Sequence, residues 1–160
     1  MNSHQPISDE NVVKEYPKST CWLEDKQVRA IGNLILTDQR LVFLKQVELS
    51  DKQAEEIRRL ATEATTGELI QFALKLHKKN FQLPLSSIVT ARMGLLSFFP
   101  VRPYLSVHYL SASKKLKTLD FMFTLPLLKR LMMSEFPTLG WRNAIKKAVK
   151  KEKKRISSGS

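Results

Sequence analysis

The stretch GNLILTDQRLVF, residues 32–43, decides the fold of this chain of 160 residues. Residues 28–37 are rich in β-branched and aliphatic side chains, and residues 40–45 form a second apolar run. The polar link at 38–39 joins the two runs with the spacing of an antiparallel β-hairpin. Gly32 inside the first run predicts a bend or the close approach of another backbone. We therefore expect a bent hairpin near the centre of a sheet.

On both sides of this hairpin the chain carries further short runs with the alternating pattern of β-strands. They are residues 12–23, 81–85, 87–93, 103–109 and 117–123. Together with the hairpin they predict about seven antiparallel strands. The fold class that follows is mainly β with helices, an α+β protein.

Helical spacing replaces the strand pattern over residues 51–79, directly after the hairpin. Residues 51–66 follow Ser50, and Gln53 stands where a capping box needs it. Residues 68–79 are apolar around most of the helix circumference, which predicts a helix buried on most sides. The sequence thus predicts a pair of helices inserted after the third strand.

Two more helices are expected near the C-terminus. A short one covers residues 125–135 and stops at Pro137, and the last one runs from 141 to 155. The last helix has a narrow apolar stripe made by Trp141, Ala144, Ile145, Ala148 and Val149. We expect this stripe to cover one end of the sheet. The opposite face is basic and carries Lys146, Lys147, Lys150, Lys151, Lys153, Lys154 and Arg155.

The charge of the chain is concentrated in that helix. The whole chain has 27 Lys and Arg against 15 Asp and Glu, a net charge of +12. Residues 141–160 contain eight of the basic side chains and a single acid, Glu152. Such a block favours phospholipid head groups, nucleic acid or acidic protein surfaces as partners. The alternative interpretation is that these charges only keep an exposed helix face solvated.

Two further segments are candidate interaction sites. The basic turn with Lys114, Lys115 and Lys117 could bind anions, or could simply be a solvated hairpin tip. Residues 94–100 form an expected loop whose apolar side chains are Leu95, Leu96, Phe98 and Phe99. This loop either contacts a membrane or a partner, or is buried against the helix at 68–79.

Several classes of protein are disfavoured by what the sequence lacks. The single cysteine, Cys21, cannot form an intramolecular disulfide, and no apolar run approaches the ~18 residues of a membrane span. The N-terminal residues do not resemble a secretory signal. No metal-ligand spacing, glycine-rich phosphate loop or nucleophile motif is present. We therefore expect a cytoplasmic protein without catalytic activity, metal or cofactor.

The hairpin residues 32–43 resemble the second and third strands of the GRAM and bacterial pleckstrin-homology-like family. Residues 83–88, LPLSSI, resemble a later strand of that family, and Trp141 with Ile145 resembles its capping helix. The resemblance implies a bent antiparallel barrel of about seven strands, closed by the C-terminal helix. It also implies loops that bind phosphoinositide, another anionic lipid or a protein.

In lipid-binding members of that family the loop between the first two strands is basic. Here Lys26 and Arg29 stand in this loop beside Glu24 and Asp25. The two carboxylates repel phosphate, so a specific inositol-phosphate pocket in this loop is disfavoured.

These observations predict one domain over residues 11–155, with flexible ends at 1–10 and 156–160. The expected function is peripheral association with an anionic membrane through the basic last helix. The alternative is a protein-interaction scaffold or homo-oligomer that uses the inserted helices. Nucleic-acid binding is less favoured, because the basic tail lacks interleaved aromatic side chains.

Overall fold

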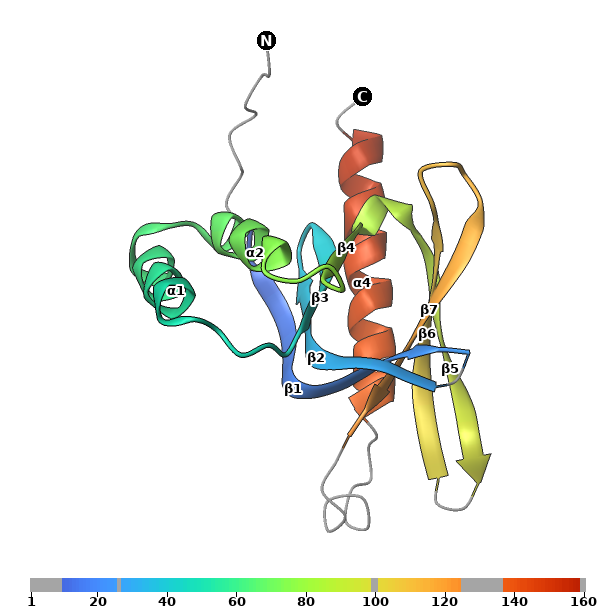
Figure 1. Cartoon of the computed structure of the whole chain (residues 1–160). Coiled ribbons are helices and arrows are strands. Elements are labelled where there is room, and N and C mark those ends of the chain that lie inside the picture. The colour runs from blue at the N-terminus through green and yellow to red at the C-terminus, as the bar shows by residue number, and fades with distance from the viewer. Residues whose placement is uncertain (1–9, 26, 99–100, 125–136, 159–160) are drawn as a thin grey trace.

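A computed structural model describes residues 10–25, 27–98, 101–124 and 137–158. It has the predicted α+β architecture, in which an antiparallel seven-stranded sheet is combined with helices (Figure 1). The helix expected at 125–135 lies outside the described residues. The strands are β1 (Val12–Glu24), β2 (Gln27–Thr37), β3 (Arg40–Lys45), β4 (Phe81–Pro84), β5 (Ile88–Phe98), β6 (Val101–Leu110) and β7 (Leu116–Phe123). The helices are α1 (Asp51–Glu63), α2 (Thr66–Lys75), the short 3₁₀ turn η1 (Leu85–Ser87) and α4 (Pro137–Ser158).

The sheet has the strand order β4-β3-β2-β1-β7-β6-β5 and is not closed into a barrel. Strand β1 joins the two halves, because its first part pairs with β2 alone and residues 20–23 pair with both β2 and β7. Strands β4 and β5 are the two edges, and the short turn η1 connects them. The expectation of a closed barrel is therefore wrong, since β4 has only four residues and leads directly into that turn.

The hairpin predicted from residues 32–43 is confirmed. Strands β2 and β3 pair in register from Gly32 with Lys45 to Leu36 with Leu41. A Cβ atom on Gly32 would lie 2.1 Å from the carbonyl oxygen of Leu44. The glycine is therefore required here, because the backbone of β3 leaves no room for a Cβ atom.

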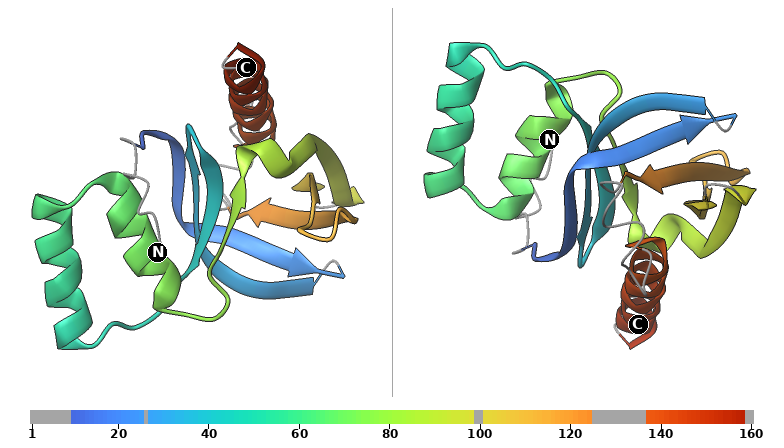
Figure 2. Two further views of the ribbon diagram at one scale, coloured as in Figure 1. Left: turned by 90° about the horizontal axis from the view of Figure 1, so that it is seen from above. Right: turned by 90° about the horizontal axis from the view of Figure 1, so that it is seen from below.

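Both faces of β2 and β3 are covered, which explains why residues 34–37 are all buried. On one face Leu34 and Phe43 belong to the main core, which also contains residues of α4. On the other face Ile35 and Val42 pack against Ile70 of α2. Helices α2 and α4 thus lie on opposite sides of this hairpin (Figure 2).

The two inserted helices are confirmed, and both begin with a capping box, but α1 ends at Glu63 and α2 spans Thr66–Lys75, so residues 76–79 are not part of it. The expectation that the second helix is buried on most sides is wrong, because its only buried residues are Gly67 and Ile70. Helix α1 has no buried residue. The remaining apolar side chains of α2 are half-buried, since α1 covers only part of its outer side.

Helix α4 is longer at both ends than expected. It begins at Pro137, because proline is tolerated in the first turn of a helix. It continues to Ser158, so residues 156–158 are helical and do not form a flexible tail. The predicted apolar stripe is confirmed: Trp141, Ile145 and Val149 are buried in the main core. The Trp141 ring stacks on Phe123, with 5.7 Å between ring centroids.

The described part of the N-terminus is fixed by an ion pair. Residues 1–10 were expected to be flexible, and residues 1–9 lie outside the described residues. Glu10, however, is buried: it accepts hydrogen bonds from the Thr37 hydroxyl at 2.5 Å and from Arg40 Nε at 2.8 Å. A paired carboxylate can be buried because its charge is compensated. The expectation is therefore wrong for Glu10.

Of the helices in the described ranges, none combines the length and the apolar character needed to cross a bilayer.

Candidate functional site

The basic residues predicted on the last helix all lie on the solvent side of α4. Residues 146, 147, 150, 151 and 153–155 are exposed, while the stripe between them faces the core. Among the described residues, no acidic side chain forms an ion pair with any of the six lysines of this group. The helix therefore presents uncompensated positive charge to solvent.

Arg155 differs from the lysines because its charge is already compensated. Its Nε and Nη2 atoms each donate to Glu152, at 2.9 Å in both cases. These bonds, and the attraction of that carboxylate, raise the pKa of Arg155. Glu152 is the acid predicted to stand alone in the basic block, and it holds Arg155 on the side of α4 near Asp38.

The basic turn at 111–115 is a tight hairpin tip between β6 and β7. The Ser111 amide donates to the Lys115 carbonyl at 2.9 Å, and the Lys114 amide donates to the Ser111 carbonyl at 2.8 Å. Lys114 has a positive φ of 57°, in the left-handed region. Lys114, Lys115 and Lys117 are all exposed. The backbone bonds of the turn thus hold three cations at its tip.

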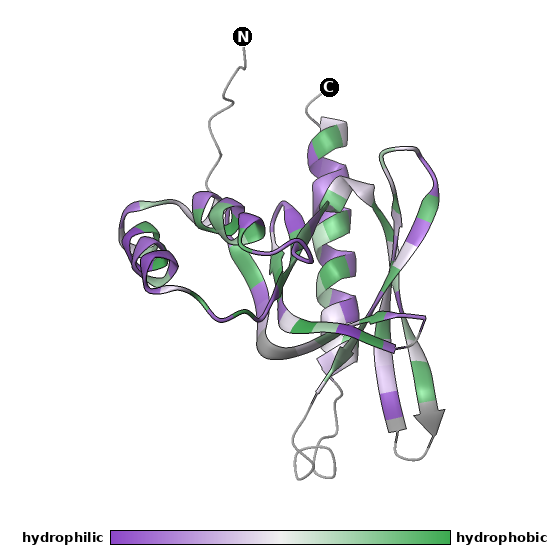
Figure 3. Ribbon diagram, in the orientation of Figure 1, coloured by the Kyte–Doolittle hydropathy of each residue, from purple (hydrophilic) through white to green (hydrophobic). Residues whose placement is uncertain are grey.

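The fold brings these two predicted basic groups to the same end of the molecule. In Figure 1 the C-terminal half of α4 and the tip of the β6–β7 hairpin both lie at the top. Figure 3 shows hydrophilic segments along both elements. We call this region the basic end and define it by the exposed lysines of the two elements. They are Lys114, Lys115 and Lys117 of the hairpin and Lys150, Lys151, Lys153 and Lys154 of α4, with Lys146 and Lys147 one turn earlier, at the middle of the helix.

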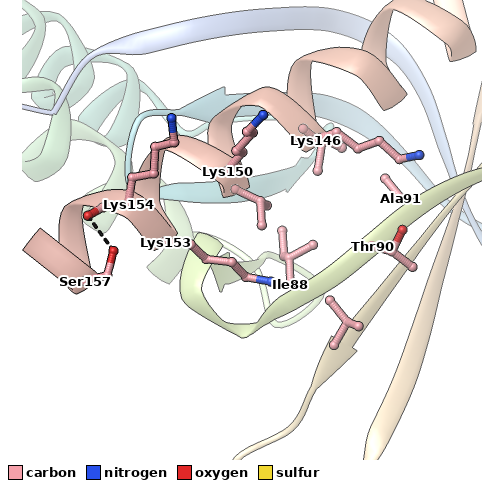
Figure 4. A pocket seen from close by; sticks show the side chains of 11 residues that line it. Ile88, Thr90, Ala91, Lys146, Lys150, Lys153, Lys154 and Ser157 are labelled. Carbon is pink, nitrogen blue, oxygen red and sulfur yellow. Dashed lines mark hydrogen bonds between the residues drawn. The ribbon is translucent and has the colours of Figure 1, made fainter.

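A groove of about 380 Å³ runs between α4 and the edge strand β5 within the basic end (Figure 4). Its apolar lining includes Ile88, Ala91 and Val149. The side chains of Lys146, Lys150, Lys153 and Lys154 also line it, and Lys153 reaches toward Ile88 (Figure 4). The groove therefore combines an apolar floor with a cationic rim.

Exposed apolar side chains that were not among the predicted site residues accompany the lysines at this end. Leu110 and Leu116 are direct cross-strand partners beside the turn, and they are 45% and 62% exposed. Ile156 in the last turn of α4 is 52% exposed. The signal available in the sequence was the position of the two leucines immediately outside the polar turn.

The apolar segment at 94–100 is placed elsewhere and is mostly not a loop. Residues 94–98 continue strand β5, with Leu95 paired to Pro103 and Phe98 to Val101. Leu95 is 48% exposed and Leu96 half-buried; Phe99 and the side chain of Phe98 lie outside the described residues. Burial against α2 is also wrong, because α2 packs on β2 and β3. This end of β5 lies opposite the basic end (Figure 1).

At the turn between β1 and β2, the positive charge of Arg29 is already compensated by a carboxylate. Arg29 Nε lies 3.1 Å from Glu24 Oε2, and Lys26 lies outside the described residues.

The remaining candidates for chemistry are the single cysteine and possible metal ligands. Burial raises the pKa of the Cys21 thiol, which disfavours the reactive thiolate. No cluster of three or more potential metal ligands occurs within the described residues.

No protein-family model matches this sequence, and no curated protein matches it.

Proposed function

We propose that this protein is a non-enzymatic binding module that associates peripherally with anionic membrane surfaces through its basic end. The observation that carries the proposal is the presence of two uncompensated lysine groups at the same end of the fold. We also propose that the bent sheet with its covering helix is a pleckstrin-homology-like fold. Strands β4 and β5 do not pair with each other; the turn η1 connects them, and α4 packs against η1 and β5.

The expected strength of the interaction follows from the number of lysines that can reach the surface together. Each lysine near an anionic bilayer contributes about 1 kcal/mol. Several acting at once would give reversible, salt-sensitive binding. The exposed leucines of the hairpin add an apolar contribution where they reach the acyl boundary. Insertion of the α4 stripe is excluded from this mechanism, because that stripe is buried in the core.

Vesicle co-sedimentation of the full chain tests the proposal. Binding should rise with the fraction of phosphatidylserine in phosphatidylcholine vesicles and fall with added salt. Lys150→Gln with Lys154→Gln should weaken binding, whereas Lys52→Gln with Lys75→Gln, on the inserted helices, should not. Absence of binding at low salt, or an equal loss in both double variants, would contradict the proposal. Duplex DNA as competitor separates membrane binding from general attraction to polyanions.

A protein partner is a second candidate function, favoured by the groove beside β5. Strand β5 is an edge of the sheet, and an edge strand can pair with an added extended segment. The lysines on the rim of the groove favour an acidic segment. Hydrogen exchange with an acidic peptide tests this: protection should appear at residues 88–93. Protection spread over the whole basic end would instead indicate unspecific charge attraction.

A further inference from the structure

A second cationic site lies away from the basic end, where β3 ends and the chain returns from α2 to β4. Its central residues are Lys45, the last residue of β3, and His77, just beyond α2. Both are half-buried, together with Lys79. The Asn80 side chain fixes the geometry, because its Oδ1 accepts from the Lys45 amide at 2.7 Å and its Nδ2 donates to the Ala73 carbonyl at 2.8 Å.

The imidazole of His77 has a defined orientation. Its Nδ1 accepts a hydrogen bond from the backbone amide of Lys79, with 3.0 Å between the nitrogen atoms. A neutral imidazole whose Nδ1 accepts must carry its proton on Nε2. If the imidazole ring were flipped by 180°, its Cδ2 atom would face that amide and could not accept the hydrogen bond. The proton is therefore assigned to Nε2.

Nε2 of His77 lies 3.3 Å from the Nζ atom of Lys45. A lysine ammonium group has only donors, and the protonated Nε2 is also a donor. Two donors thus face each other, so neither can accept from the other. An oxygen atom with more than one lone pair, placed beside both groups, would accept from each of them.

The charges around the imidazole have the sign that such an oxygen requires. Partial burial and then the cations Lys45, Lys79 and Lys78 lower the pKa of His77. The groups acting on the ring are thus all positive. The Nζ of Lys79 donates a hydrogen bond to the Arg29 carbonyl at 3.1 Å, which gives that side chain a defined position. An anion would relieve the repulsion between these groups.

We propose that Lys45, His77 and Lys79 form a binding site for a phosphate group. A phosphate offers several acceptor oxygens on one anionic centre, which matches a set of donors that converge from two segments of the chain. The site lies at the opposite end of β3 from the turn near Arg155 and shares no residue with the basic end. It is therefore independent of the membrane surface proposed above.

An NMR titration of the histidine side chains in the full-length protein tests this site. Inorganic phosphate should raise the pKa of His77 by about 1, because an anion at hydrogen-bond distance favours the charged imidazole. The ring resonances of His108, whose Nδ1 lies 2.9 Å from Thr118 Oγ1, should not respond to phosphate and serve as the internal reference. Chloride at matched ionic strength is the control for screening.

Lys45→Met should abolish the response, and Lys79→Met is the second variant should the first not fold. A parallel titration with phosphatidic acid vesicles tests whether the phosphate is carried by a lipid. A His77 response to free phosphate or to these vesicles alone supports the site and identifies its source. A His77 pKa that neither probe moves, or that shifts equally in Lys45→Met, would overturn the proposal.

Discussion

Lys114 combines an unfavourable backbone conformation with a charge that the proposed membrane surface would use. Its φ of 57° is unfavourable for a side chain with a Cβ atom, by about 1–2 kcal/mol. Glycine adopts this conformation freely, although it loses more entropy on folding. Lysine at this position therefore costs stability and adds a positive charge at the hairpin tip.

We expect Lys114→Gly to raise the free energy of unfolding by up to about 1 kcal/mol and to lower the affinity for anionic vesicles. Lys115→Gly is the matched control, because it removes the same charge at a residue without a positive φ. It should weaken vesicle binding similarly but should not stabilise the fold. Urea unfolding and co-sedimentation measure the two effects, and stabilisation by both variants would contradict the explanation.

Trp141 differs from Lys114, since its side chain is buried in the core and we expect it to contribute to stability alone. It is fully buried, and its ring stacks on Phe123 and lies 5.8 Å from Lys14 Nζ. Trp141→Ala should lower the free energy of unfolding by about 3–5 kcal/mol. Ile156→Ala in the same helix should change it by less than about 0.5 kcal/mol. Similar losses in both would show that α4 is not held by its stripe.

At the scale of elements, α4 is divided into a part that packs and a part that does not. The last buried residue is Val149, and residues 153–158 are all exposed. The C-terminal turns can therefore contribute charge with little influence on the core.

Lys153→Gln with Lys154→Gln, which leaves the pair between Arg155 and Glu152 in place, should keep the free energy of unfolding within about 0.5 kcal/mol of the unchanged chain. The double variant should lower vesicle affinity by about thirtyfold, because two lysines of the basic end are lost at about 1 kcal/mol each. Thermal unfolding and co-sedimentation provide the comparison. Loss of the fold would show that the end of α4 stabilises the protein. Unchanged affinity would show that these two lysines do not contact the membrane.

At the scale of the whole molecule, the common location of the hairpin and the C-terminal half of α4 has a measurable consequence. A flat membrane can contact both lysine groups at once only if they lie at one end. Their contributions should then be additive, since well-separated residues behave independently.

We expect Lys114→Gln with Lys115→Gln, and Lys150→Gln with Lys154→Gln, each to cost about 2 kcal/mol of vesicle binding. The quadruple variant should cost about 4 kcal/mol. Leu95→Ser, at the opposite end of β5, should have no effect. A quadruple variant no weaker than one double variant would mean that only one group reaches the membrane.

The local features of this chain could be predicted because they depend on nearby residues. Two apolar runs joined by a short polar link identified the hairpin around Gly32, and Ser50 with Gln53 identified the start of α1. The stripe around Trp141 identified the buried face of α4. The groove and the basic end needed the fold. The same holds for the contact between Lys45 and His77, which are 32 positions apart.

What the sequence by itself determined is therefore the central hairpin, the two inserted helices and the buried stripe of α4, because side-chain periodicity is a local property. It did not determine how far α2 is buried or that residues 94–98 continue β5. Only the tertiary structure decided that the sheet stays open between β4 and β5, that Glu10 is buried against Arg40, and which lysines share one end. These outcomes depend on the sum of every turn and packing angle between remote segments. No single stretch of the chain contains that sum.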